Sequence, residues 1–331
     1  MNWDQIWYGQ DWRSTAFLPL SWLTGWVARR RRKQALERWQ HQSSPYPVPI
    51  VVVGNLTAGG TGKTPVVGLL AQVAIAQGLR VGIVSRGYGG IASQWPRRVI
   101  ETSDPAVVGD EPLMLHIQTR APVVVGVDRP RAVEMLLQTS EVDLVLCDDG
   151  LQHYALWRDF EILVVDGVRQ LGNQRLLPAG PLRESPDRLN TVDWVLERSA
   201  TPREGRFGFQ VQAMVLRNLL TQQTLPLHGL NTEPCVNAVA GIGNPEGFFQ
   251  QLEAAGYRLN RVPLPDHFDY EQSIQNKLVK GPVLLTDKDA VKSGAIGGDD
   301  TWVVEAQVDA VKLTQAWIDW CQQCKSTNKS Y

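Results

Sequence analysis

An apolar strand that runs directly into a glycine-rich loop is the feature that most constrains the fold of this chain. The run Ile50-Val51-Val52-Val53 is entirely β-branched, and the loop from position 54 to position 64 follows it without a break. Glycines in such a loop let successive backbone N–H groups point to one place, and a following helix adds the positive end of its dipole. Phosphate oxygens fit that concavity, so the segment predicts a binding site for a nucleoside triphosphate.

The loop follows the pattern G-x-x-x-x-G-K-[ST], except that Thr57 stands in place of the first glycine. In this pattern Lys63 brings a positive charge to the β- and γ-phosphates, and the hydroxyl of Thr64 is a Mg²⁺ ligand. The apolar run 66–76 supplies the helix that the pattern requires after the loop. The predicted nucleotide-binding residues are Thr57, Ala58, Gly59, Gly60, Thr61, Gly62, Lys63 and Thr64.

Short apolar runs alternate with helical stretches over the first two thirds of the chain. Buried strands separated by helices predict an α/β fold with a doubly wound, mostly parallel sheet of the P-loop NTPase type. Such a sheet binds its ligand at the carboxyl ends of its strands. The expected strands are 50–53, 81–84, 122–127, 144–147, 162–165 and 194–196.

The pattern changes near Arg206, where a second and smaller α/β unit is expected. An alternating segment predicts extended chain at 207–215, and further runs predict strands at 235–242, 281–286 and 302–306 and helices at 245–255 and 308–321. The expected organisation is an N-terminal membrane-associated helix (1–41), a P-loop core (42–205) and a smaller C-terminal unit that packs over the active site (206–331).

The first 41 residues carry a membrane-binding signal. Six of the twelve tryptophans lie in the first 39 positions, and an apolar run at 16–28 precedes the basic block 29–33. That run corresponds to about 20 Å of helix, which is too short for a hydrocarbon core of about 30 Å. We expect an amphipathic helix that lies in the interface of an anionic membrane. The alternative is a helix packed on the protein's own core, followed by a solvated basic tail.

Composition excludes several classes of protein. The net charge of −1 argues against a nucleic-acid-binding surface. Four cysteines are too few and too scattered for a disulfide framework, as expected in a reducing cytoplasm. Cys321 and Cys324 have the spacing of a metal-binding or redox pair, but no second pair accompanies them, so we interpret them as part of a helix.

Two pairs of acidic residues stand at the ends of predicted elements. Asp148 and Asp149 follow the strand 144–147, about 85 residues after the phosphate loop, where P-loop enzymes place a carboxylate that holds Mg²⁺. Asp110 and Glu111 open a helical run. They are interpreted either as helix-capping acids or as the base and a metal-side carboxylate of a phosphoryl-transfer site, and the residues alone favour neither.

Two motifs of the second region indicate no chemistry by themselves. Asp266 and His267 lie in a loop, where such a pair is more typical of a surface turn than of a catalytic pair. The stretch 286–289 is superficially similar to the guanine-reading motif Asn-Lys-x-Asp, but Ala290 occupies the final acidic position. GTP specificity is therefore not supported.

Six motifs, taken in order, resemble the tetraacyldisaccharide 4′-kinase family, the lipid A 4′-kinases. They are Asn55-Leu56-Thr57-Ala58-Gly59-Gly60-Thr61-Gly62-Lys63-Thr64-Pro65, Ser85-Arg86-Gly87-Tyr88-Gly89, Gly109-Asp110-Glu111-Pro112, Asp148-Asp149-Gly150-Leu151-Gln152-His153, Leu176-Leu177-Pro178-Ala179-Gly180-Pro181-Leu182-Arg183-Glu184 and Thr286-Asp287-Lys288-Asp289-Ala290-Val291-Lys292. The resemblance runs from the N-terminal helix to about Lys292.

This resemblance implies a reaction, a cofactor and a cellular location. The γ-phosphoryl group of ATP, with Mg²⁺, would pass to the 4′-hydroxyl of a tetraacylated glucosamine disaccharide 1-phosphate in lipopolysaccharide biosynthesis, giving lipid IVA. The implied partners are this glycolipid and the membrane surface, with no nucleic acid and no obligate protein partner. The implied location is the cytoplasmic face of the inner membrane.

The resemblance also implies roles for single residues. Asp110 matches the family's proposed general base, and Lys63 matches its phosphate-loop lysine. His267 falls where the family has a histidine that pairs with the base, which reverses its interpretation as part of a surface turn. The residues that match the family's metal side are Thr64, Glu111, Asp148 and Asp149.

Two arginines of this chain match basic residues of the family, and two positions differ from its usual pattern. Arg129 and Arg183 look like its basic residues near the phosphates, with Arg131 as the alternative to Arg129. Phe268 stands where the family often has a second histidine, and Asp287 stands where it often has glutamate, which preserves the charge.

Two other functions are compatible with a phosphate loop. One is a membrane-associated ATPase of the partitioning or metal-delivery type, whose loops resemble Lys-Gly-Gly-x-Gly-Lys-Thr; here Ala58 replaces the first lysine, which argues against it. The other is a nucleotide-gated membrane adaptor without catalysis, which the many accompanying acids disfavour.

Overall fold

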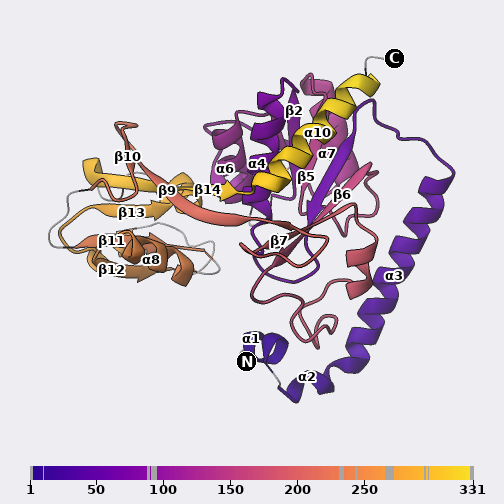
Figure 1. Ribbon diagram of the computed structural model, residues 1–331, viewed down its shortest axis with the longest axis horizontal. Helices are drawn as coiled ribbons and strands as arrows, with labels where there is room; N and C mark the ends of the chain where they lie inside the picture. The colour runs from indigo at the N-terminus through magenta and orange to yellow at the C-terminus, as the bar shows by residue number, and fades with distance from the viewer. Residues whose placement is uncertain are drawn as a thin grey trace.

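The part of the chain that the structure describes forms two units, each built of one sheet and the helices that pack on it (Figure 1). The structure is a computed structural model and describes residues 3–9, 11–87, 90, 95–230, 235–242, 245–264, 272–293, 296 and 298–328. The first sheet has eight strands and carries the phosphate loop, and the second has six. A long helix, α3 (Leu18–Gln40), runs along one side of the first unit.

The first sheet is parallel except for one edge strand among those described. Its strand order is β3-β4-β2-β5-β1-β6-β7-β8, and β3 is antiparallel to β4. The β-branched run lies in the middle, with Val52 opposite Cys147 on one side and Glu161 on the other. Burial of both sheet faces explains why these strands read as continuous apolar runs. The strands are β1 (Ile50–Gly54), β2 (Val81–Ser85), β3 (Arg97–Val99), β4 (Val123–Val125), β5 (Leu144–Asp148), β6 (Phe160–Asp166), β7 (Trp194–Arg198) and β8 (Phe207–Gly208).

Helices cover both faces of this sheet. They are α4 (Lys63–Ala76), α5 (Pro105–Val108), α6 (Asp110–Thr119), α7 (Arg129–Thr139), the 3₁₀ helix η1 (Pro186–Asn190) and α10 (Val311–Asn328). One core cluster joins α4, α6 and α10 through Leu70, Leu115 and Trp317, and α7 contributes Leu136 to a second cluster. The doubly wound α/β fold expected from the sequence is confirmed, and the ends of β1 and β5 meet the start of α4 at one edge.

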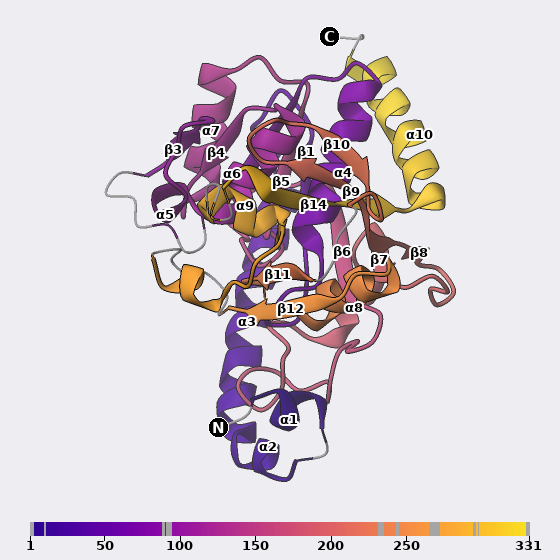
Figure 2. The same ribbon diagram turned by 90° about the vertical axis from the view of Figure 1, so that its left-hand side faces the viewer.

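The second sheet joins an antiparallel half to a parallel half. Its order is β10-β9-β14-β13-β11-β12, and the pairings from β14 to β12 are parallel. Its elements are β9 (Gln210–Asn218), β10 (Thr224–Pro226), β11 (Val236–Ala240), α8 (Pro245–Ala254), β12 (Leu259–Pro263), η2 (Gln272–Lys277), β13 (Val283–Thr286), α9 (Asp287–Ser293), η3 (Gly298–Asp300) and β14 (Thr301–Asp309). The short helix α9 contacts α6 of the first unit, as the turned view shows (Figure 2).

The N-terminal helices dock on a loop of the first unit. They are α1 (Trp3–Tyr8), α2 (Arg13–Ala16) and α3. The hydroxyl of Ser21 donates to the carbonyl of Leu176 at 2.7 Å and accepts from the amide of Ala179 at 3.0 Å. No helix among the described residues is both long enough and apolar enough to cross a membrane.

Two segments from the expected C-terminal unit (206–331) lie in the first unit. β8 extends the first sheet beside β7, and α10 packs on α4, where the indole N–H of Trp317 donates to the carbonyl of Leu70 at 2.9 Å. The boundary between strand and helix also differs from the expected one: β14 continues to Asp309 because it pairs with β9 along this length, and α10 begins at Val311.

Candidate active site

The phosphate loop has the backbone shape that its glycines allow. Gly59 and Gly62 have φ values of 104° and 89°, in the left-handed region that favours glycine. The side-chain amide of Asn55 donates to the carbonyl of Gly59 at 3.2 Å, which holds the loop across its width. Helix α4 begins at Lys63, so its N-terminal amides face the loop, as an anion site requires.

The first part of the loop is paired with a distant segment. The amide of Ala58 donates to the carbonyl of Pro181 at 2.8 Å, and Thr57 forms an antiparallel bridge with Leu182. Ala58 was predicted to bind nucleotide, but its amide is engaged within the protein in this conformation. Thr57 and Ala58 therefore fix the position of the loop relative to residues 181–183.

Three predicted metal-side groups converge at the head of α4. The hydroxyl of Thr64 lies 3.3 Å from Oε2 of Glu111 and 3.3 Å from Oδ2 of Asp148. Burial raises the pKa of Asp148 to about 7, and the negative charges of Glu111 and Asp149 act in the same direction. Two acids that meet at a buried hydroxyl have the chemistry of a divalent-cation site, since a cation would offset their repulsion.

The orphaned oxygen of Asp148 gives a direct test of this fit. Its Oδ1 atom is buried and has no hydrogen-bond partner among the described residues. Within that part of the chain, no group of three or more His, Cys, Asp or Glu side chains gathers as a complete metal cage. The residues therefore fit Mg²⁺ held by one hydroxyl and one or two carboxylates, with waters and nucleotide phosphates as its other ligands.

Asp149 pairs with two basic side chains of the site, Lys63 and Arg183. Nζ of Lys63 lies 3.5 Å from its Oδ1, and Nη1 of Arg183 lies 3.2 Å from the same atom. Burial acts to raise the pKa of Asp149, but the positive charges of Lys63 and Arg183 outweigh it and lower the pKa below its ordinary value. Asp149 also has a φ of 50°, a strained conformation for a residue with a side chain and one that recurs at functional sites.

Asp110 and Glu111 are the first two residues of α6, and each meets a lysine of the second unit. Lys292 Nζ lies 3.1 Å from Asp110 Oδ2, and Lys288 Nζ lies 3.7 Å from Glu111 Oε1. No role was predicted for either lysine. A signal was present, because both follow a predicted strand at helical spacing, but their partners lie more than 170 residues away in the sequence.

The structure separates the two candidate arginines. Arg129 is buried at the start of α7, where its backbone N–H donates to Nε2 of His153 at 3.4 Å, and its positive charge acts to lower the pKa of Asp148. Arg131 is exposed and pairs with its neighbour Asp128 at 3.6 Å. This geometry favours Arg129 as the arginine that faces the acids.

Two further polar residues link the parts of the site. Gln152 donates to the backbone carbonyl of Asn55 and to Glu184, both at 3.0 Å, and its Oε1 accepts from Arg183 at 3.4 Å. Both residues lie in the family motifs, yet no role was predicted for them. Asp266 and His267 lie outside the described residues, as does part of the motif that begins at Ser85.

A family of known proteins matches most of this chain. A family model described as tetraacyldisaccharide-1-P 4′-kinase matches residues 13–322. The tetraacyldisaccharide 4′-kinase of Alkalilimnicola ehrlichii is 46% identical over 93% of this chain and 92% of its own, and that of Ectopseudomonas mendocina is 43% identical over 96% and 94%. The crystal structure of the "apo" form of LpxK from Aquifex aeolicus in complex with ATP superposes with a TM-score of 0.77 at 26% identity, covering 93% of this chain and 99% of that one.

Proposed function

Because this chain belongs to the tetraacyldisaccharide-1-P 4′-kinase family, we propose that its phosphate loop and the acids at the start of α6 carry out the family's phosphoryl transfer. The chain is an ATP-dependent kinase that acts on the 4′-hydroxyl of tetraacyldisaccharide 1-phosphate in lipid A biosynthesis, and its product is lipid IVA. The observation that carries the residue assignments is the convergence of Thr64, Glu111 and Asp148 beside Asp110.

The donor side of the proposed mechanism uses the loop and its basic residues. The amides of the loop and the start of α4 bind the phosphates. Lys63 gives up its ion pair with Asp149 and pairs with the phosphate oxygens instead. Mg²⁺, held by Thr64 with Asp148 and Glu111, would neutralise the charge that develops on the transferred group. Arg183 keeps Asp149 ionised and in place while Lys63 exchanges partners.

The acceptor side depends on Asp110. We assign it as the base that takes the proton of the 4′-hydroxyl as that oxygen attacks the γ-phosphorus in line with the departing ADP. Its place as the first residue of α6 supports this role, because Glu111, the next residue, lies 3.3 Å from the hydroxyl of Thr64 at the head of the phosphate loop's helix. His267, through the family resemblance, would orient this carboxylate.

The test is a kinase assay on Asp110→Asn with γ-labelled ATP and tetraacyldisaccharide 1-phosphate. Removal of a positioned base is expected to lower kcat by about 10²–10⁴-fold, while ATP binding stays close to wild type. Turnover within a few-fold of wild type would eliminate Asp110 as the base. Release of free phosphate in place of labelled lipid would instead indicate an ATPase of the partitioning type.

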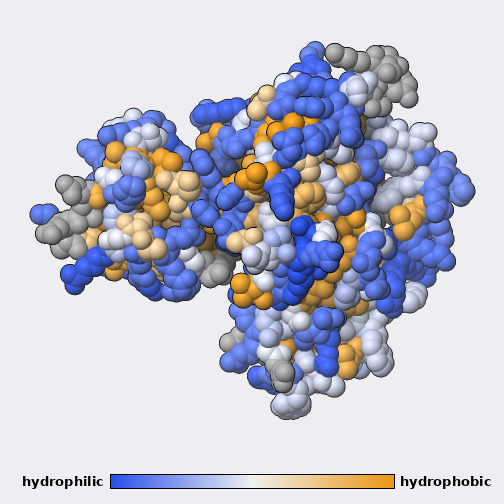
Figure 3. All heavy atoms as spheres, in the orientation of Figure 1, coloured by the Kyte–Doolittle hydropathy of each residue, from blue (hydrophilic) through white to orange (hydrophobic). Residues whose placement is uncertain are grey.

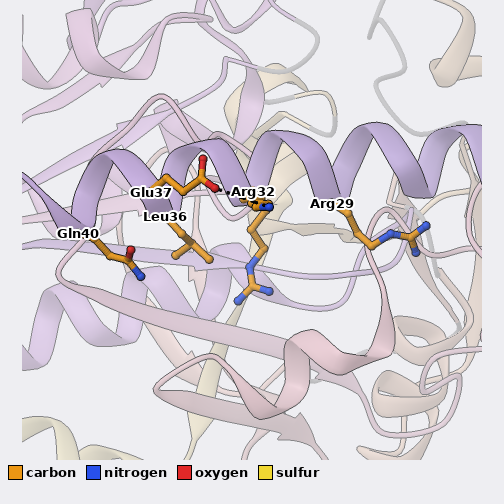
Figure 4. A pocket seen from close by; sticks show the side chains of 6 residues that line it. Arg29, Arg32, Leu36, Glu37 and Gln40 are labelled. Carbon is orange, nitrogen blue, oxygen red and sulfur yellow. Dashed lines mark ion pairs between the residues drawn. The ribbon is translucent and has the colours of Figure 1, made fainter.

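We also propose that α3 places the enzyme on the cytoplasmic face of the inner membrane. Trp22, Leu23 and Trp26 are exposed by 70%, 55% and 53%, and they share the outward side of the helix opposite Ser21 and Gly25. The basic block follows on the next turns, where Arg29, Arg32 and Lys33 help to line a shallow pocket of about 380 Å³ (Figure 4).

The surface around α3 supports peripheral binding. Hydrophilic residues cover much of its outer edge, and paler residues gather at the lower end of the molecule around α1 and α2 (Figure 3). Exposed tryptophans next to a basic stretch suit the boundary of an anionic bilayer, with tryptophan at headgroup level and arginine near the phosphates. An acylated acceptor resides in that layer, so this placement would bring the enzyme to its substrate.

A further inference from the structure

Helix α9 of the second unit brings two lysines to two catalytic-site acids of the first. Lys288 and Lys292 are four residues apart, so they project from the same side of the helix. Their side chains are only 12% and 9% exposed, and they meet Glu111 and Asp110 at 3.7 and 3.1 Å. Buried lysines are rare unless they are paired, which makes this arrangement a specific feature of the interface between the units.

The backbone of α9 is held firmly behind these lysines. Asp289 is fully buried, and its Oδ2 accepts from the amide of Gly241 at 2.9 Å and from the hydroxyl of Thr286 at 2.5 Å. The carboxylate of Asp287 accepts from the amide of Ala306 at 3.2 Å. The helix is thereby fixed to β13, β14 and the residue that follows β11, so its lysines have a defined place from which to reach α6.

Of the two lysines, Lys292 makes the closer contact, and its partner is the proposed base. It lies between two carboxylates, with Asp289 Oδ1 at 4.0 Å behind it and Asp110 Oδ2 at 3.1 Å in front. A short charge-assisted contact fixes the direction of a carboxylate as well as its charge. A base must lie within hydrogen-bond reach of the proton it accepts, and a displacement of about 1 Å costs on the order of 10²-fold in rate.

Lys288 acts on the neighbouring acid in a complementary way. Glu111 directs Oε2 toward the hydroxyl of Thr64 and Oε1 toward Lys288, so one carboxylate connects the first unit to the second. Its orientation toward the proposed metal position therefore depends on a residue from the other sheet.

We propose that Lys292 is a positioning residue that holds Asp110 in its catalytic orientation, and that Lys288 does the same for Glu111. The second unit then completes the active site through α9. This inference rests on the proposed role of Asp110 as the base, and the experiment below separates the failure of one from the failure of the other.

The test compares Lys292→Met, Lys292→Arg and the exposed control Lys280→Met in the full-length kinase assay, with KM for ATP, kcat and thermal unfolding measured for each. Lys292→Met is expected to lower kcat by about 10²-fold and to leave KM for ATP within about threefold of wild type. Lys292→Arg restores a positive charge and is expected to recover most of the loss. Lys280→Met is expected to match wild type.

A double-mutant cycle with Asp110→Asn identifies the residue through which Lys292 acts. If Lys292 works by orienting Asp110, adding Lys292→Met to Asp110→Asn lowers kcat by no more than about threefold further. An unchanged or increased kcat for Lys292→Met would overturn the inference, as would equal losses in both backgrounds or a defect confined to unfolding temperature. Full activity of Asp110→Asn would instead refute the proposed base.

Discussion

At the scale of single residues, His153 shows how the surroundings of the site set a protonation state. It lies next to Arg129, whose amide donates to its Nε2 at 3.4 Å. Burial lowers the pKa of His153 to about 4, and the positive charges of Arg129 and Arg158 act in the same direction. The imidazole is therefore neutral at physiological pH and acts as a hydrogen-bond acceptor behind the acids.

This lowered pKa predicts a pH-dependent loss of stability. The ordinary value for histidine is 6.5, so as the pH falls the unfolded chain binds the proton first and the folded state is disfavoured. Between about pH 6.5 and about pH 4, wild type is expected to lose about 2 kcal/mol more unfolding free energy than His153→Gln, a figure reduced to allow for the partial exposure of the ring. Urea unfolding at several pH values measures this difference; parallel curves for the two proteins would contradict it.

Some residues of the site were predicted from the sequence, and others were not. Thr64 was predicted from the loop pattern, Asp148 from its place at the end of a strand, and Glu111 through the family resemblance. The structure places the carboxylates of Asp148 and Glu111 each 3.3 Å from the hydroxyl of Thr64. Lys288 and Lys292 were missed because their function depends on a contact between units. A local pattern encodes an edge of a sheet, but it does not encode which other element comes to face that edge.

At the scale of elements, α3 combines two faces with different partners. Ser21 and Gly25 face the loop 175–183, where a Cβ on Gly25 would lie 2.5 Å from Cδ1 of Leu176. The helix extends to Gln40, well beyond the apolar run 16–28, because the residues that follow are mostly good helix formers. The alternative of a helix packed on the protein's own core thus describes one face of α3, while the tryptophans occupy the other.

Because the two faces of α3 have different partners, we expect that membrane binding can be removed without loss of kinase activity. The double variant Trp22→Ser and Trp26→Ser is expected to bind anionic vesicles at least about tenfold more weakly, because binding scales with the apolar area that enters the interface. Its kcat on detergent-dispersed acceptor is expected to match wild type. Leu220→Ser, which alters an exposed apolar residue of the second unit, is the control for vesicle sedimentation. Equal binding by wild type and the double variant would show that α3 is not the anchor.

At the scale of the whole molecule, the last helix stabilises the first unit. Trp317 of α10 is fully buried and stacks on Trp320 at 4.6 Å, and its indole meets Trp194 edge-on at 6.2 Å. The sequence pattern predicted a helix at 308–321, but it did not reveal on which sheet that helix would pack. The assignment of that helix to the second unit followed from its place in the sequence, whereas burial against α4 determined its place in the fold.

Trp317→Ala is accordingly expected to lower the free energy of unfolding of the first unit. Truncation of a fully buried tryptophan typically costs about 3–5 kcal/mol of unfolding free energy. The loss is expected to appear as a lower temperature at which ATP binding disappears. The exposed neighbour Val311→Ala is expected to change stability by no more than about 0.5 kcal/mol. Unaltered thermal unfolding of Trp317→Ala would show that α10 contributes little to this core.

The pairing of β9 with β14 determines how the two units are joined. The chain leaves the first unit through β9 and returns through β14, and these strands are hydrogen-bonded from Gln210 opposite Asp309 to Asn218 opposite Trp302 (Figure 1). The second unit is therefore an insertion with both ends side by side, and the first is a discontinuous domain completed by α10. A bulge bends a strand and increases its twist, so the register shift between Glu305 and Ala306 helps to set the direction in which the second unit extends from the first. Lys288 and Lys292 therefore reach α6 from a unit that is joined to the first by two paired strands rather than by a single flexible linker.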